Sequence, residues 1–209
     1  LLIGCKEKYA FVSLGLLVSD ESNRLTKTMG RINRIDLRMN DLALLARRVS
    51  EVFPSAGASR QAIDQRLKIL KEQLAKLRAD IEEEARKTEA GVPCEPGPFF
   101  RRAERLAGDL ADAELRSGAE LAAALGSVQR SLSDRPTQLR STAPVDYYAR
   151  DCLYAAGVAE RYLRAATGID PRKGTPAARR LATYLWRASQ FLSRAAESRK
   201  RSSSAQAQA

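Results

Sequence analysis

The 209-residue chain contains no histidine, only three cysteines and a single tryptophan. The absence of histidine excludes catalysis by a Ser-His-Asp or Cys-His arrangement, and it excludes zinc or haem held by imidazole. Consecutive carboxylates at Glu82, Glu83 and Glu84 do not make a cation site, because on a helix they point about 100° apart and cannot converge on one ion. We therefore predict a non-enzymatic protein without a metal site or a cofactor.

Aromatic residues are also scarce, at 6% of the chain, whereas 44% of the residues are hydrophobic and 29% are charged. Ala, Leu, Arg and Glu predominate, a composition typical of long helices and coiled coils. Most prolines and glycines lie between segments with helical apolar periodicity. The sequence therefore predicts an all-α fold.

Two long segments carry a seven-residue repeat of apolar side chains. The first spans about residues 6–53, with interruptions at Glu21 and Thr28, and the second follows a turn at 54–58, with Ser59 as its expected N-cap. Neither segment can bury its apolar stripe alone, so we expect a long antiparallel helical hairpin over residues 6–90. The repeat positions are Phe11, Leu14, Val18, Leu25, Ile32, Ile35, Met39, Leu42, Ala46, Val49 and Phe53, then Ile63, Leu67, Leu70, Leu74, Leu77 and Ile81.

A linker at 91–98 holds three prolines and is the predicted domain boundary, because prolines interrupt a helix. Beyond it we expect a basic three-helix bundle over residues 99–200 and a disordered tail at 201–209. The expected helices cover about 99–132, 145–166 and 176 onward, with a polar loop at 134–144. The residues expected to face inward are Leu106, Leu110, Ala113, Leu121, Leu125, Val128, Cys152, Ala156, Ala159, Leu163, Leu181, Leu185 and Leu192.

Local signals mark particular points in this bundle. Ser117 and Gly118 are a weak point in its first helix, and Gly168 is the expected left-handed cap at the end of its second. Thr175 is the expected N-cap of the last helix, with Pro176 at the first helical position, where its missing N–H costs nothing.

The net charge is +11, and residues 145–209 contribute most of it, with twelve cations and five acids. Four arginines there repeat every seven residues and share one helix face, with Tyr184, Phe191 and Trp186 on its two sides. Guanidinium groups bind phosphate, so this stripe is a candidate anion-binding surface for nucleic acid, acidic lipid or an acidic partner. The alternative is an ordinary solvated helix face. The stripe consists of Arg180, Arg187, Arg194 and Arg201.

The chain opens with Leu1-Leu-Ile-Gly-Cys5 and turns polar at Lys6-Glu-Lys8. Leu2, Ile3, Gly4 and Cys5 fill the four positions of a lipobox, so this segment resembles the end of the signal peptide of bacterial lipoproteins. The resemblance implies that Cys5 is acylated and that residues 1–5 are a signal remnant, which places the protein at a membrane in the bacterial cell envelope. The alternative is a chance match in a cytoplasmic protein. The apolar run at 9–18 is about half the length of a membrane span, so we assign it to the first helix. The alternative is that it belongs to an ordinary signal segment.

If Cys5 is acylated, Cys94 and Cys152 remain as an even pair that an oxidising periplasm favours as a disulfide. A disulfide needs Cα atoms within about 7 Å, whereas the helix over 99–132 is roughly 50 Å long if unbroken. The pairing therefore requires a break near Gly118 or a loop at 133–144 that runs back along the helix. Otherwise Cys152 is a small buried apolar residue.

From these features we predict a cell-envelope lipoprotein that acts as a structural or interaction module through its hairpin and its basic C-terminal helix. One alternative is an intracellular scaffold or assembly subunit that uses its helical seams for self-association or for binding a protein partner. The other is a basic nucleic-acid-associated protein whose binding weakens with salt and depends on Arg180, Arg187 and Arg194. None of the three requires a small-molecule substrate.

Overall fold

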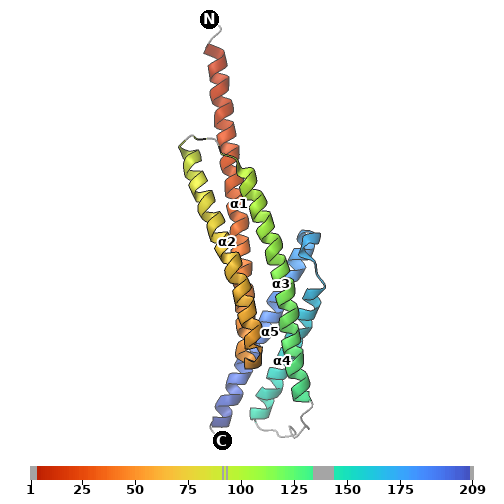
Figure 1. The fold of residues 1–209 in the computed structure, drawn as a ribbon. Helices are drawn as coiled ribbons and strands as arrows, with labels where there is room; N and C mark the ends of the chain where they lie inside the picture. The colour runs from red at the N-terminus through yellow and green to blue at the C-terminus, as the bar shows by residue number, and fades with distance from the viewer. Residues whose placement is uncertain (1–3, 91, 93, 134–143, 208–209) are drawn as a thin grey trace. The chain divides into compact units, whose positions relative to one another are not determined.

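The structure is a computed structural model that describes residues 4–90, 92, 94–133 and 144–207, with side chains described except at 4–19, 128–133, 144–146 and 175. No strand occurs among these residues, and the predicted all-α fold is confirmed. Figure 1 shows the helices in chain order. They are α1 (Gly4–Val52), η1 (Pro54–Ala56), α2 (Gly57–Glu89), α3 (Pro96–Ser133), α4 (Pro144–Thr167), η2 (Pro171–Lys173) and α5 (Thr175–Ala207).

The helices form two compact units that do not follow the predicted domain boundary at 91–98. The first unit contains Leu1–Arg38 and Ile69–Asp109, and the second contains Met39–Lys68 and Leu110–Ala209. Helices α1, α2 and α3 therefore each contribute to both units. The boundary differs because the start of α3 packs with the hairpin and helps to bury the apolar stripes of α1 and α2.

The apolar repeats of α1 and α2 form the core of an antiparallel hairpin joined by η1 (Figure 1). Every predicted position from Leu25 to Phe53 and from Ile63 to Ile81 is buried. The side chains of Phe11, Leu14 and Val18 lie outside the described residues. Burial of these stripes is the main stabilising contribution to each helix, since isolated helices are marginal in water.

The two interruptions of the α1 repeat have structural roles. Thr28 is 1% exposed, and its hydroxyl donates to the carbonyl oxygen of Arg24 at 2.9 Å, so it can occupy a core position. A carboxylate oxygen of Glu21 accepts a hydrogen bond from the backbone N–H of Cys94 at 3.3 Å. This contact ties the connection between α2 and α3 to α1 within the first unit.

Two helix starts differ from the sequence predictions. Helix α2 begins at Gly57 directly after η1, so Ser59 lies inside the helix and is not its N-cap. Helix α3 begins at Pro96, so the break in the chain is shorter than 91–98. Pro96 and Pro98 fit there because the N–H groups of a first helical turn have no acceptor within the helix.

The ends of α4 and α5 also differ from prediction. Gly168 has no positive φ; the N–H of Ile169 instead bonds the carbonyl of Ala166 at 3.0 Å in a tight turn. Among the described glycines, the one with positive φ is Gly174, at 114°, immediately before α5. Helix α5 includes Thr175, whose side chain is not described, and it continues to Ala207, so most of the predicted disordered tail is helical.

Helix α3 passes through Ser117 and Gly118 without a break. Ser117 is fully buried, and its hydroxyl has no hydrogen-bond partner among the described residues. A Cβ atom at Gly118 would lie 3.9 Å from the Cγ2 atom of Thr167, at the end of α4. These small residues therefore bring α3 and α4 close together in the second unit. Residues 134–143 of the predicted polar loop lie outside the described chain.

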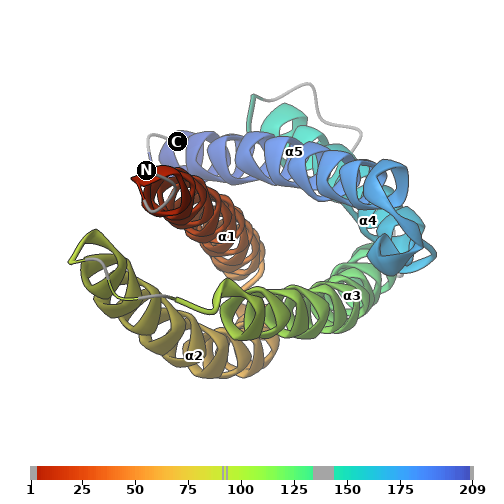
Figure 2. The same cartoon turned by 90° about the horizontal axis from the view of Figure 1, so that it is seen from above.

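Helices α4 and α5 pack side by side along their lengths in the second unit (Figure 2). The predicted inward residues of α4 are all buried, but on α5 Leu185 is only half-buried. Small side chains on both helices permit the close approach of the two backbones. The buried residues of the two helices include Cys152, Ala155, Ala156, Ala159, Leu163, Leu181, Ala188, Leu192 and Ala195.

Candidate functional site

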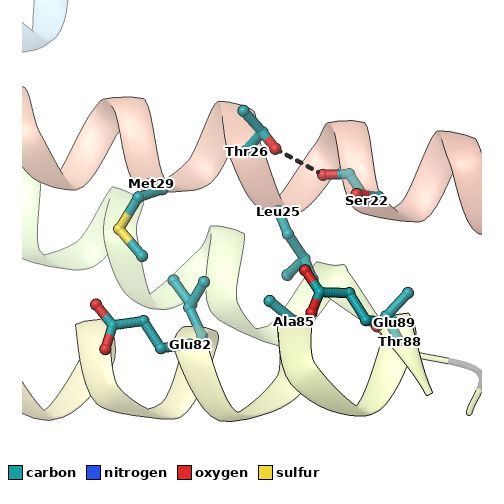
Figure 3. A pocket seen from close by; sticks show the side chains of 9 residues that line it. Ser22, Leu25, Thr26, Met29, Glu82, Ala85, Thr88 and Glu89 are labelled. Atoms are coloured by element: carbon teal, nitrogen blue, oxygen red, sulfur yellow. Dashed lines mark hydrogen bonds between the residues drawn. The ribbon is translucent and has the colours of Figure 1, made fainter.

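The first candidate site is a groove of about 320 Å³ between α1 and α2 in the first unit (Figure 3). Its floor is apolar and is formed by Leu25, Met29, Ile81 and Ala85. Leu25 and Ile81 are buried, whereas Met29 and Ala85 are partly exposed. We call these four residues and their polar rim the hairpin groove. The rim consists of Ser22, Thr26, Glu82, Thr88 and Glu89.

The two threonine hydroxyls of the rim are already bonded within their own helices. Thr26 donates to the carbonyl oxygen of Ser22 at 3.0 Å, the dashed line in Figure 3, and Thr88 donates to the carbonyl oxygen of Glu84 at 2.9 Å. The two threonine hydroxyls are therefore not free to bind a ligand, and the floor of the groove is apolar.

The carboxylates near the groove differ in their pairing. Lys87 pairs with Glu83 at 2.9 Å and with Glu84 at 3.5 Å. The hydrogen bond with Lys87 lowers the pKa of Glu83, and the same bond raises the pKa of Lys87. Glu82 and Glu89 are exposed and make no ion pair within the described part of the chain. The rim of the hairpin groove on α2 therefore carries uncompensated negative charge.

Polar contacts between helices hold the walls of the groove in place. Arg78 of α2 donates to the side-chain oxygen of Asn33 on α1 at 3.1 Å. Arg102 of α3 pairs with Asp80 of α2 at 2.7 Å. Arg31 of α1 lies 4.2 Å above the ring of Phe100 on α3. Each of the three helix segments in the first unit is thus linked to the other two.

The second candidate site is the predicted arginine stripe on α5, and much of it contacts α4. Arg194 makes a bidentate pair with Asp151, which also accepts a hydrogen bond from Ser198 at 2.5 Å. The hydrogen bond with Arg194 lowers the pKa of Asp151, and the same bond raises the pKa of Arg194. This arginine therefore binds the α4–α5 pair together and is not free for an external anion.

The other stripe residues have different surroundings. Arg201 pairs with Glu197 at 2.5 Å and lies 5.9 Å from the ring of Tyr148. Arg187 donates to the hydroxyl of Tyr162 at 3.2 Å without a carboxylate partner, and Arg180 is exposed. The four arginines of the stripe therefore differ in their surroundings, because α4 covers one side of α5. The seven-residue repeat of α5 alone did not indicate this difference.

The rings beside the stripe are also divided between two environments. Tyr162 of α4 contacts Tyr184 and Phe191 of α5, with ring centroids 5.9 Å apart in both cases. Trp186 lies outside this ring cluster and is 62% exposed. The ring cluster stabilises the α4–α5 interface, whereas the indole is available to solvent.

The two described cysteines are free and buried. Cys94 lies in the first unit and Cys152 in the second, and no disulfide joins them in this structure. Burial raises the pKa of both thiols, so neither is activated as a nucleophile. The side chain of Cys5, the predicted acylation site, lies outside the described residues.

Within the described ranges, no three His, Cys, Asp or Glu side chains are placed to hold a metal ion. The described helices also include none with the length and hydropathy of a membrane span. Comparison with protein families, characterised proteins and solved structures finds no match to the chain. The hairpin groove was not found from the sequence, because the repeat marks which residues are apolar but not where two packed helices leave a gap.

Proposed function

We propose that this protein is a non-enzymatic cell-envelope lipoprotein, anchored by an acyl group on Cys5, whose helical hairpin binds a partner protein. The hairpin groove is the observation that carries the binding role. It offers an apolar floor with an acidic rim on a hairpin that the contacts between α1, α2 and α3 hold in place. Grooves of this kind bind the apolar face of an amphipathic helix.

The expected occupant is an amphipathic helix of the partner that carries cations beside its apolar face. The small side chain of Ala85 in the floor permits the close approach of another helix. Glu82 and Glu89 offer charge complementarity to Lys or Arg on that helix, which favours correct orientation and rapid association. An acidic helix would meet repulsion at the same rim.

The anchor rests on the lipobox-like residues Leu2 to Cys5 and on the polar residues that follow them. An acyl group there would join the membrane to α1, which continues from Gly4 into the hairpin. Diacylation at one cysteine is sufficient for stable membrane attachment. The anchor and the groove would thus lie on the same helix.

Photocrosslinking in the native host tests the groove. A photoreactive residue at Met29 should crosslink to an amphipathic helix of one partner, whereas the same probe at Lys76, an exposed position on α2 in the same unit, should not. Glu82→Lys with Glu89→Lys should abolish the crosslink, while Glu72→Lys with Glu95→Lys, at exposed positions away from the groove, should preserve it. A crosslink to a second copy of the chain would instead show that the groove serves self-assembly, and it would contradict binding to a partner protein.

Intact mass and fractionation test the anchor separately. The full-length gene product should be a membrane species that starts at Cys5 and carries added acyl mass, and Cys5→Ser should release it. A soluble wild-type species with an unmodified Cys5 would overturn the lipoprotein assignment without affecting the crosslinking result.

A further inference from the structure

Helix α5 carries a second exposed surface, which we call the Trp186 surface. It consists of Arg179, Arg180, Trp186 and Arg187, all exposed. Arg180 and Arg187 are seven residues apart, as are Arg179 and Trp186, so the four side chains occupy adjacent directions over two turns of the helix. They therefore form one continuous surface on the second unit.

Positive charge on the Trp186 surface is not compensated. Residues 171–196 contain six cations and no acid. Of those cations, Arg172 pairs with Asp112 and Arg194 pairs with Asp151. Arg179, Arg180 and Arg187 have no carboxylate partner among the described residues. The surface therefore attracts anions, and salt should screen this attraction only in part when contact is close.

The rings on this side of the molecule decide between two anionic partners. Single-stranded nucleic acid needs several free rings on which successive bases stack. Here Tyr162 of α4 stacks on Phe191 of α5 and makes a tilted contact with Tyr184, so these three rings are engaged between the two helices. The exposed rings of Tyr147 and Tyr154 lie on α4, whereas Trp186 is the exposed ring on α5 itself, beside three guanidinium groups. An indole among cations is typical of side chains that lie at the level of phospholipid headgroups.

We propose that the Trp186 surface binds anionic phospholipid headgroups, which gives the protein a membrane contact that does not depend on Cys5. The guanidinium groups of Arg179, Arg180 and Arg187 bind headgroup phosphates, and the indole of Trp186 inserts between headgroups. The contact goes beyond the proposed acyl anchor and partner groove, because it uses a different helix and a different chemistry.

Trp186 is the only tryptophan in the chain, so its fluorescence reports on this surface alone. The full chain with Cys5→Ser, which carries no acyl group, is mixed with vesicles of phosphatidylcholine with or without phosphatidylglycerol. Emission should shift to shorter wavelength only with phosphatidylglycerol, and brominated lipids should quench it. Binding should weaken as salt is added.

Charge variants locate the contact. Each cation near an anionic surface contributes about a factor of five to the affinity, so Ala at Arg179, Arg180 and Arg187 together should weaken vesicle binding roughly 100-fold. Ala at Lys68, Lys76 and Arg116 removes the same charge from exposed positions elsewhere and should change binding only a few-fold. If the larger variant does not fold, Arg179→Ala with Arg180→Ala serves in its place. This pair of changes removes no side-chain hydrogen bond or ion pair among the described residues, and binding should weaken roughly 25-fold.

Three outcomes would overturn the proposal. One is the absence of any spectral shift with phosphatidylglycerol vesicles. Another is an equal loss of binding in the two triple variants, which would indicate attraction by net charge alone. The third is tighter binding to a single-stranded oligonucleotide than to vesicles, with quenching of Trp186. Because Cys5 is replaced throughout, these results are independent of whether that cysteine is acylated.

Discussion

The guanidinium of Arg199 on α5 donates hydrogen bonds to the backbone carbonyls of Val52 and Glu51, the last two residues of α1. The final carbonyls of a helix have no partner within it and carry the negative end of its dipole. Arg199 of α5 therefore caps the C-terminal end of α1, although Val52 lies 147 residues earlier in the chain. The two helices are joined by this contact in the second unit.

Replacement of Arg199 by Met should destabilise the protein by about 1–2 kcal/mol, because it leaves these carbonyls without a charged donor while keeping the apolar stem. Chemical unfolding measures the change. Lys200→Met, at the exposed neighbouring position, should stay within about 0.5 kcal/mol of the wild type. Equal changes in the free energy of unfolding for the two variants would mean that the contact of Arg199 with α1 does not contribute to stability.

Asp151 should make stability depend on acid pH. Arg194 and Ser198 hold its pKa below the ordinary value of 3.8, so its charged form stabilises the folded state above that value. This contribution is lost as the pH falls through the lower pKa of the folded protein. Asp151→Asn should cost about 1–2 kcal/mol at neutral pH and almost nothing in strong acid.

The matched control for Asp151 is Glu197→Gln, which breaks the exposed pair with Arg201. Both side chains of that pair are more than half exposed, so its loss should change stability little at any pH. A constant difference between wild type and Asp151→Asn from neutral to acid pH would contradict the proposed linkage.

Leu74→Asp tests the hairpin core. Leu74 is 4% exposed on α2, and a carboxylate there has no partner that compensates for its lost hydration. The cost should reach about 4 kcal/mol or more, with reduced helicity and a less cooperative thermal transition by circular dichroism. Gln73→Asp, on the exposed face of the same turn, should melt nearly as the wild type does.

Two glycines of α3 should respond differently to alanine. At Gly108 a Cβ atom has no neighbour within 4 Å, so alanine should stabilise the helix by about 0.5–1 kcal/mol. At Gly126 the Cβ atom would lie 2.8 Å from Oε1 of Glu160, whose carboxylate pairs with Arg164. Displacement of the buried Glu160 carboxylate from the exposed Arg164 should make Gly126→Ala less stable than Gly108→Ala by about 1–2 kcal/mol.

The cysteines give a prediction about reactivity. Cys94 and Cys152 should alkylate slowly in the native protein, because both are buried and burial raises the pKa of each thiol. In denaturant without reductant both should react fully, and intact mass counts the added groups. Protection that persists until reduction would instead show the disulfide expected for an oxidising periplasm.

The sequence predicted the helical cores well because the repeat reports directly on which side chains are buried. Ile32, Met39, Leu77 and Leu110 are all fully buried at predicted positions. Leu45 and Val52 were missed, although they are 1% exposed. In the second unit this part of α1 also contacts α5, through Arg48 and Ser189 for example, so burial extends beyond a single stripe.

Contacts between distant segments could not be predicted. Asp151 and Arg194 each have an ordinary local sequence, and nothing in either position indicates the other. The arginine repeat was correctly located on one helix, but its surroundings depend on how α4 packs against that helix. The hairpin groove likewise depends on the spacing between two helices, which the apolar pattern does not encode.

Because α1, α2 and α3 each pass through both units, neither unit corresponds to a continuous stretch of the chain. A cut between α2 and α3 would leave each fragment with an incomplete core: the first would lack residues 96–109 and the second would lack 39–68. The two fragments would therefore have to recombine in order to fold, as in a split-reporter system. Neither fragment is therefore expected to fold as an autonomous module.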